Sequence, residues 1–176
     1  PFCLLTTQRS GSTWLSSLLN KHPDIMMFGE LFITVPLKKS WPDEDFGKAP
    51  DYIKFKDYTG LKRPLSAIHY LELLKRKASK KRAFGFKLMY NHLVSNPEIL
   101  LKMLVDGYKI IHLVRENSLH VLLSRYSLQI RNLTGEGPHA RSSARQHKLE
   151  VKTSSLIGNL RKIDFWITAM RIVNTI

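Results

Sequence analysis

The chain begins with a short apolar run, a polar loop and a helical pattern, and this succession restricts its fold more than any other feature. Residues 2–5 are apolar and long enough for a buried strand, and apolar residues recur at helical spacing from Trp14 to Leu19. Between them, residues 6–13 form a tight polar loop. The first amides of a helix have no partner within the helix, and the helix dipole adds partial positive charge there. A strand, a polar loop and a helix in this order therefore predict an anion-binding site.

The loop contains the side chains that such a site needs. Arg9 supplies a permanent cation with a forked set of donors, and Gly11 lets the backbone approach a ligand closely. Ser10, Ser12 and Thr13 supply hydroxyl donors. The alternative is a strand joined to a helix that Ser12 or Thr13 caps. A cap alone does not need an arginine, a glycine and three hydroxyls together, so the combination favours anion binding.

This loop does not follow the Walker pattern of nucleotide-binding loops, since no lysine precedes Ser12 or Thr13 and no glycine stands five residues before Gly11. Instead, the run Arg-Ser-Gly-Ser-Thr-Trp resembles the 5′-phosphosulfate loop of sulfotransferases. The resemblance implies that the phosphosulfate end of 3′-phosphoadenosine 5′-phosphosulfate (PAPS) is bound by Arg9, Ser10, Gly11, Ser12, Thr13 and Trp14, with Arg9 also catalytic. An arginine at the first position is similar to the NodH-like, lipopolysaccharide and carbohydrate branch, whereas cytosolic aryl and steroid members carry lysine there.

An acid follows the second apolar run. Residues 25–28 predict a buried strand, and Glu30 comes after it in the run Gly-Glu-Leu-Phe. Taken alone, Glu30 is typical of a solvated loop acid. The resemblance to NodH-like sulfotransferases implies instead that Glu30 is the catalytic base that takes the proton of the acceptor hydroxyl. His92 and His112 are the next candidates for that role if Glu30 is only a loop acid.

Two later strands are associated with cations. Lys87 is the only charge in the predicted third strand and is similar to the lysine of Gly-x-Lys strands in NodH-like sulfotransferases, which makes it a further site candidate. The clearest buried strand, residues 108–114, ends at Arg115, and the next helix, which Asn117 caps, contains Ser124. An arginine where a nucleotide triphosphatase has a magnesium-binding aspartate argues for an anion and against a divalent metal. Arg115 and Ser124 resemble the sulfotransferase motif for the 3′-phosphate; without the resemblance they are typical of a surface arginine and a helix serine.

The charge balance supports anionic ligands without choosing among them. The chain has 28 Lys and Arg against 14 Asp and Glu, a formal net charge of +14. Such a field suits a nucleotide cofactor, an anionic acceptor, a membrane surface or nucleic acid. Cys3 is the only cysteine, so no internal disulfide forms, which fits the expected cytoplasmic location. The seven histidines show no metal-ligand spacing and no apolar run reaches 18 residues, so neither a metal site nor a transmembrane segment is expected.

Strands that alternate with helices predict an α/β fold with a central, mostly parallel sheet flanked by helices. The resemblance covers roughly residues 2–131 and implies a P-loop-like, three-layer sulfotransferase fold. We expect a single sulfotransferase domain over residues 1–176. The helical pattern of the last residues has no stop signal, which indicates a fragment truncated at the C-terminus. Residues 33–64 and 132–152 are expected to be irregular loops; a loop as long as 33–64 is often a lid or a binding loop, and the sequence does not assign a role to either.

The resemblance implies a PAPS-dependent sulfotransferase that moves the sulfuryl group to a hydroxyl of a carbohydrate, glycolipid or small metabolite. No metal is needed, and adenosine 3′,5′-bisphosphate (PAP) is the leaving product. Two alternatives come from other classes. A P-loop kinase-like phosphotransferase requires magnesium, and the missing Walker lysine and aspartate count against it. A basic nucleic-acid-binding module predicts binding to DNA or RNA with a steep salt dependence, whereas the sulfotransferase has no specific nucleic-acid partner.

Overall fold

The computed structural model describes residues 1–33, 49–50, 52, 63–133 and 153–173. The chain divides into two compact units, one of residues 1–7 and 11–113 and the other of residues 8–10 and 114–176. The expected irregular loops at 33–64 and 132–152 lie almost entirely outside the described residues, and the last three residues of the chain lie outside them as well. The single domain over residues 1–176 stays a prediction.

The first unit is built on a four-stranded sheet. Its strands are β1 (Phe2–Thr6), β2 (Ile25–Glu30), β3 (Ala83–Met89) and β4 (Lys109–Leu113), in the order β2-β3-β1-β4. Every pairing is parallel, which confirms the predicted parallel sheet. In β1 the apolar run Cys3-Leu4-Leu5 is completely buried, because parallel strands in the middle of a sheet are covered on both faces.

The connections that leave the neighbouring strands β1 and β3 run in opposite directions across the sheet, so the direction reverses between these two strands. From β1 the chain moves outward to β2, returns through β3 and then crosses to β4 on the other side of β1. At the carboxyl ends Thr6 is level with Leu113, and the Thr6 hydroxyl donates to the Leu113 carbonyl at 2.8 Å. Ligands of open α/β sheets bind beyond the carboxyl ends of the strands at such a reversal. Arg9 follows β1 and Arg115 follows β4 in the sequence, each within three residues of a strand end.

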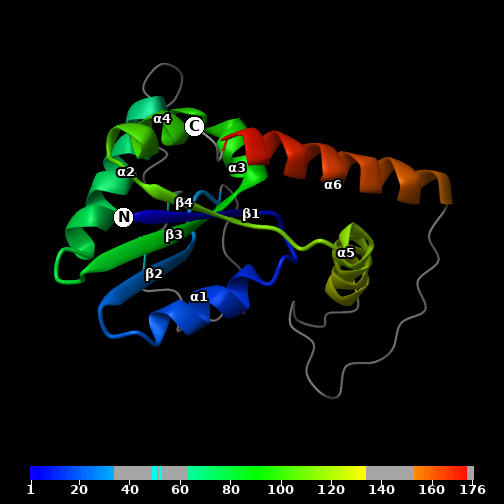
Figure 1. Cartoon of the computed structure of the whole chain (residues 1–176), viewed down its shortest axis with the longest axis horizontal. Coiled ribbons are helices and arrows are strands. Elements are labelled where there is room, and N and C mark those ends of the chain that lie inside the picture. The colour runs from blue at the N-terminus through cyan, green and yellow to red at the C-terminus, as the bar shows by residue number, and fades with distance from the viewer. Residues whose placement is uncertain (34–48, 51, 53–62, 134–152, 174–176) are drawn as a thin grey trace. The chain divides into compact units, whose positions relative to one another are not determined.

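Helices cover both faces of this sheet. Helix α1 (Ser12–Asn20) connects β1 to β2, α2 (Arg63–Lys77) precedes β3, and α3 (Tyr90–Ser95) and α4 (Glu98–Val105) lead to β4. The connection from β1 to β2 runs in one direction across the sheet and the two later connections run in the other. Because crossovers between parallel strands are right-handed, α1 lies on one face and both α2 and α4 lie on the other. Figure 1 shows this arrangement within the first unit. The predicted three-layer α/β fold is confirmed, while α3 is a short helix that the sequence pattern did not predict.

Helix α1 turns its small side chains inward. Ser12 and Ser16, one turn apart, are buried, whereas Trp14 is 70% exposed and Leu18 is 46% exposed. The apolar spacing that predicts this helix therefore does not mark its buried face. Small side chains allow the helix backbone to lie close to the strands that it covers.

An aromatic cluster packs directly behind the end of β2. Phe32 makes edge-to-face contacts with Tyr52, Tyr70 and Phe86, with ring centroids 4.9, 5.7 and 6.2 Å apart. These four rings are almost completely buried. Such pairs stabilise by about 0.5–1.5 kcal/mol each beyond the area that they bury. The cluster holds the backbone two residues after Glu30 and so anchors the end of the strand.

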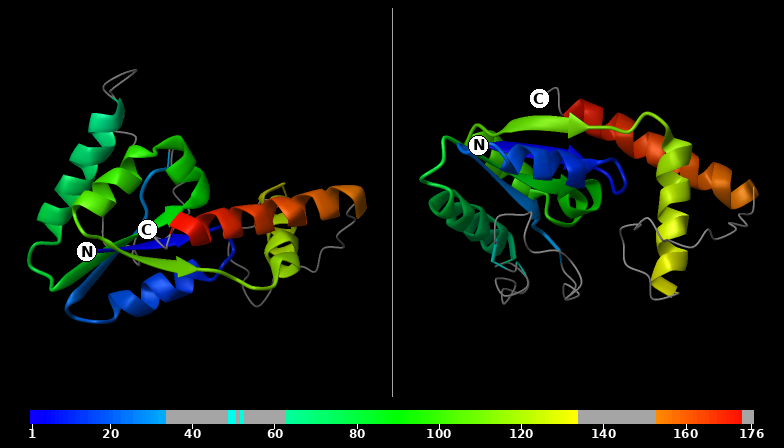
Figure 2. Two further views of the ribbon diagram at one scale, coloured as in Figure 1. Left: turned by 45° about the horizontal axis from the view of Figure 1, so that its top comes forward. Right: turned by 90° about the horizontal axis from the view of Figure 1, so that it is seen from below.

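The second unit contains α5 (Ser118–Leu133) and α6 (Thr153–Val173), which cross each other rather than run side by side (Figures 1 and 2). Asn117 caps α5 as predicted, since its Oδ1 accepts the His120 amide at 2.9 Å. Across the helix pair, the Ser118 hydroxyl donates to Asp164 at 2.6 Å. None of the helices in the described ranges is long and apolar enough to cross a membrane.

Candidate active site

A register shift at the end of β2 determines where Glu30 points. Phe28 is level with Phe86, but Glu30, two residues later, is level with Lys87, so Gly29 is the extra residue of a β-bulge. In a regular strand Phe28 and Glu30 would share a face, because side chains alternate with a period of two. The bulge moves Glu30 to the opposite face, which it shares with Lys87.

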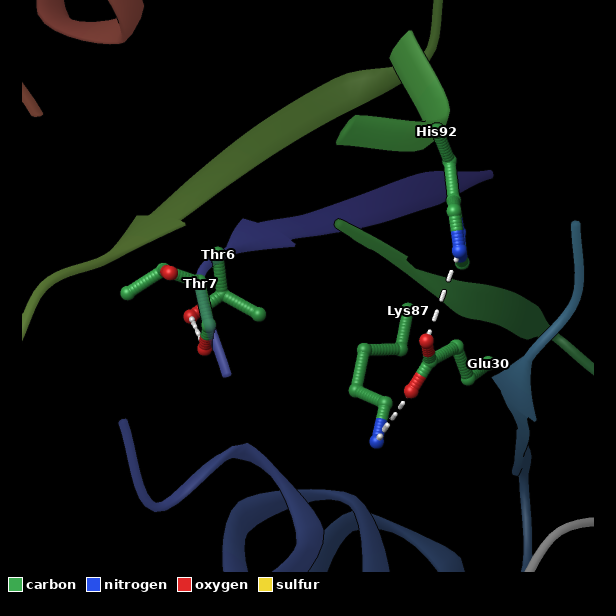
Figure 3. Close-up of polar contacts among 5 residues, drawn as sticks. All are labelled: Thr6, Thr7, Glu30, Lys87 and His92. Atoms are coloured by element: carbon green, nitrogen blue, oxygen red, sulfur yellow. Dashed lines mark hydrogen bonds and ion pairs between the residues drawn. The ribbon is translucent and has the colours of Figure 1, made fainter. Parts of the chain in front are cut away.

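The carboxylate of Glu30 lies between two nitrogen-bearing side chains (Figure 3). Its Oε2 is 3.7 Å from Nζ of Lys87, and its Oε1 is 3.4 Å from Nε2 of His92. The Glu30 side chain is only 18% exposed. Burial raises the pKa of the Glu30 carboxyl above its ordinary value, and the charge and hydrogen bond of Lys87 oppose this without cancelling it. A carboxylate with a raised pKa is a better proton acceptor near neutral pH.

Both partners of Glu30 are buried. Lys87 retains 7% side-chain exposure, and burial lowers the pKa of its ammonium while Glu30 opposes the change. Burial, together with the charge of Lys87, lowers the pKa of His92 to about 4. His92 is therefore neutral at pH 7, and its contact with Glu30 is between an imidazole and a carboxylate rather than an ion pair.

Helix α3 brings His92 to this position, and Asn96 fixes the backbone behind it. Both the backbone amide and the side-chain amide of Asn96 donate to the carbonyl of His92, at 2.9 and 3.1 Å. Asn96 does not cap α4 through its side chain, because its amide turns back to α3, where a buried carbonyl needs a donor.

No side chain caps the start of α1. Gly11 occupies the N-cap position with φ +92°. The alternative in which Ser12 or Thr13 is the N-cap is therefore wrong, since both lie inside the helix. A Cβ at Gly11 would meet nothing within 4 Å, so the left-handed backbone, and not lack of space, requires glycine there. The first amides of α1 lack the side-chain oxygen that normally accepts from them at a helix start.

Within the second unit, three of the predicted cofactor residues touch each other. Nε of Arg9 donates to the Ser124 hydroxyl at 2.7 Å, and Nη1 of Arg115 donates to the carbonyl of Arg9 at 3.3 Å. Arg9 has φ +66°, a left-handed backbone that costs a non-glycine residue about 1 kcal/mol or more. The guanidinium of Arg9 is thus directed at α5, and the guanidinium of Arg115 lies against the backbone of Arg9.

The other predicted site residues do not belong to the Glu30 cluster or to the contacts of Arg9. Ser10 belongs to the second unit, and Thr13 is half-buried at the start of α1. Trp14 is exposed, so its proposed contact with a cofactor would use an open indole face. His112 accepts from or donates to the hydroxyl of Tyr90 at 2.7 Å. Among the described residues, no group of His, Cys, Asp and Glu side chains is arranged to hold a metal ion.

Sequence reasoning named Glu30 and Lys87 separately and did not bring them together. It considered His92 only as a substitute base. The signal that could have found the cluster was the glycine directly before Glu30, because a glycine near the end of a strand often marks a bulge. The partner of Glu30 on α3 had no signal, since the helix itself was not predicted.

Comparison of the sequence with known proteins points to the same family as the motifs do. The sequence matches the model of the sulfotransferase family over residues 1–152. A relative named Nodulation protein H, from Rhizobium meliloti (strain 1021), is 26% identical over 125 residues, which are 70% of this chain and 45% of the relative. Another of the same name, from Rhizobium tropici, is 42% identical over 45 residues, 26% of this chain and 17% of the relative.

The chain therefore spans less than half the length of either relative. No solved structure matches it. The family match covers well over half of the chain and includes the loop after β1, the end of β2 and the strand that ends before Arg115. Together with the parallel α/β sheet, this match shows that the chain belongs to the sulfotransferase family.

Proposed function

We propose that this protein transfers the sulfuryl group of PAPS to a hydroxyl group of an acceptor. The observation that carries the proposal is the buried Glu30 carboxylate, which the bulge in β2 sets between Lys87 and His92. Membership of the sulfotransferase family makes sulfuryl transfer the reaction class that this base would serve. The acceptor oxygen attacks sulfur, the bond from sulfur to the bridging phosphate oxygen breaks, and Glu30 takes the acceptor proton.

In this proposal the loop after β1 binds the phosphosulfate. The uncapped start of α1, led by Gly11, offers amide donors, and Arg9 offers a cation. The motif adds four further residues to the proposed phosphosulfate site: Ser10, Ser12, Thr13 and Trp14. Arg9 and the loop amides stabilise the negative charge that develops on the bridging oxygen as the bond breaks. Arg115 and Ser124 hold the 3′-phosphate, which distinguishes PAPS from donors that lack it.

The proposal also covers the class of acceptor and the absence of a metal requirement. A carbohydrate or glycolipid is the expected acceptor, through the NodH-like resemblance of the loop and of Glu30. The reaction requires no metal, because Arg9 and Arg115 supply the positive charge that magnesium supplies in nucleotide triphosphatases. The cytoplasmic location stays a prediction.

A thermal shift comparison tests the donor. PAP without metal should raise the melting temperature, and PAP at about 100 times its Kd should add roughly 2.7 kcal/mol of stability. ATP with magnesium and a single-stranded oligonucleotide are the matched ligands for the two alternatives. Stabilisation by ATP only with magnesium would favour a phosphotransferase. Steeply salt-dependent stabilisation by the oligonucleotide, without a response to PAP, would favour a nucleic-acid-binding module.

Replacing Glu30 by glutamine tests the base. Glutamine keeps the size of the side chain and removes its basicity, so kcat should fall roughly 100-fold or more while PAP affinity stays almost unchanged. The measurement is turnover with an active acceptor, together with a PAP titration of the same variant. Near-normal turnover would show that Glu30 is not the base.

A further inference from the structure

Among the described residues, His92 is one of two that contact the carboxylate of Glu30, and the reaction as proposed gives it no role. It lies on α3, its side chain is 10% exposed, and its Nε2 faces Oε1 of Glu30. Its other ring nitrogen, Nδ1, is buried and has no hydrogen-bond partner among the described residues. A buried ring nitrogen without a partner is rare and calls for a physical explanation.

The two nitrogens together determine where the imidazole proton sits. A neutral imidazole carries one N–H and one bare lone pair. A proton on Nδ1 would be a buried donor without an acceptor, and it would leave the Nε2 lone pair facing the negative Glu30 oxygen. A proton on Nε2 points at that oxygen and leaves only an unused acceptor at Nδ1, which is the less costly state. The ring is therefore the Nε2–H tautomer while Glu30 is ionised.

We propose that His92 is a positioning residue for the base: its Nε2–H donates to Oε1 of Glu30 and holds the carboxylate in the orientation that receives the acceptor proton. This inference rests on the proposed function, in which Glu30 is the base. The distance of 3.4 Å is longer than a mature hydrogen bond, as is common for catalytic contacts before substrate binds. Among the residues that the structure describes, the second oxygen, Oε2, is paired with Lys87 alone, at 3.7 Å, which leaves lone pairs for the acceptor.

The same geometry excludes His92 as the base itself. In the Nε2–H tautomer the free lone pair of the ring is on Nδ1, which is buried, so the ring presents no proton acceptor to an acceptor hydroxyl. Its pKa of about 4 also makes it a weak acceptor at neutral pH. The donors from Asn96 to the His92 carbonyl hold the backbone from which the ring projects. The backbone of His92 is therefore held in place, and its ring is neutral at pH 7.

The electrostatic surroundings of Glu30 are simple enough for a clean test. Lys87 from β3 and His92 from α3 are the titratable groups in contact with it among the described residues. Helix α1, which packs on β2, contains no titratable side chain between Ser12 and Asn20. A hydrogen bond to an ionised carboxylate lowers its pKa, so removing the His92 donor must raise the pKa of Glu30.

His92→Gln and His92→Met form the matched pair of variants. The two side chains have nearly the same length, but only glutamine has an amide that donates to Oε1. The methionine variant should lose roughly 10- to 100-fold in kcat through misplacement of the base, and the acid limb of its kcat/KM profile should move up by about one pH unit. The glutamine variant should keep most of the activity and the wild-type limb. Equal losses in both variants, or no loss in the methionine variant, would overturn the proposal.

Two spectroscopic readouts do not depend on turnover. Titration of the Glu30 side-chain carboxyl by carbon-13 NMR, assigned by its absence from Glu30→Gln, should show a higher pKa in His92→Met than in His92→Gln. In the wild-type protein, nitrogen-15 shifts of His92 should report a neutral ring protonated at Nε2. A ring protonated at Nδ1, or at both nitrogens at pH 7, would refute the positioning role. If Glu30→Gln keeps its turnover, the proposed function loses its base, while these spectra still decide whether His92 holds Glu30.

Discussion

Replacing Lys87 by methionine removes the cation next to Glu30 and keeps a side chain of similar length. The Nζ to Oε2 distance is 3.7 Å, and both side chains are largely buried. At an effective dielectric constant of about 20, two unit charges at this distance attract by roughly 4 kcal/mol. One pKa unit corresponds to about 1.4 kcal/mol, so the pKa of Glu30 can rise by at most about 3 units when Lys87 is lost.

The expected shift is smaller than this limit. The Glu30 side chain is 18% exposed, water screens part of the attraction, and the His92 contact remains in the variant. We expect the pKa of Glu30 to rise by about 1–2 units. Lys87 favours the ionised carboxylate, so its removal favours the protonated form, and the acid limb of kcat/KM moves to higher pH. Activity is then lost first at the acid end of the profile.

The assay is kcat/KM against pH, together with carbon-13 titration of Glu30. Lys102→Met is the matched control, because Lys102 is also paired with acids, at 2.6 Å from Glu72 and 2.8 Å from Asp106, but it has no contact with Glu30. This control should leave the acid limb in place. An acid limb that stays unmoved in Lys87→Met, with the Glu30 titration unchanged, would refute the electrostatic reasoning for this pair.

Two further predictions concern the cofactor and the sheet. Arg115→Ala should abolish most of the stabilisation by PAP and leave the melting temperature of the free protein nearly unchanged; equal stabilisation of the wild-type protein by AMP and by PAP would contradict the 3′-phosphate role of Arg115 and Ser124. In β3, Gly85→Ala places a Cβ against the ring of Phe2 and should lower stability by about 1–3 kcal/mol in a denaturant titration. If the clash is the cause, the double variant Gly85→Ala, Phe2→Ala should lose less stability than the losses of the two single variants added together. A loss in the double variant that equals or exceeds that sum would contradict the clash.

Much of the fold was predictable because it depends on local patterns. Apolar runs marked all four strands. Runs without alternating polarity predicted strands buried on both faces, which is right for β1 and β3. It is wrong for β4, expected to be the clearest buried strand, because β4 lies at an edge of the described sheet and Ile111 is 44% exposed. The cap at Asn117 was predictable because its acceptor and donor are three residues apart. The alternative of a cap at Ser12 or Thr13 was wrong, because the helix begins one residue earlier and Gly11, with its left-handed backbone, occupies the N-cap position.

By itself, the sequence determined the order of strand, loop and helix, the residues available for anion binding, and the acid at the end of the second strand. These features depend on residues that are neighbours in the sequence, so their spacing and side-chain chemistry are enough to predict them. Only the tertiary structure decided that a bulge at Gly29 turns Glu30 to Lys87, that His92 from α3 meets the same carboxylate, and that Arg9 reaches Ser124. These contacts join residues that are 57, 62 and 115 positions apart in the sequence. Such contacts, like the register of the strands, arise from packing of the fold, which no local pattern encodes.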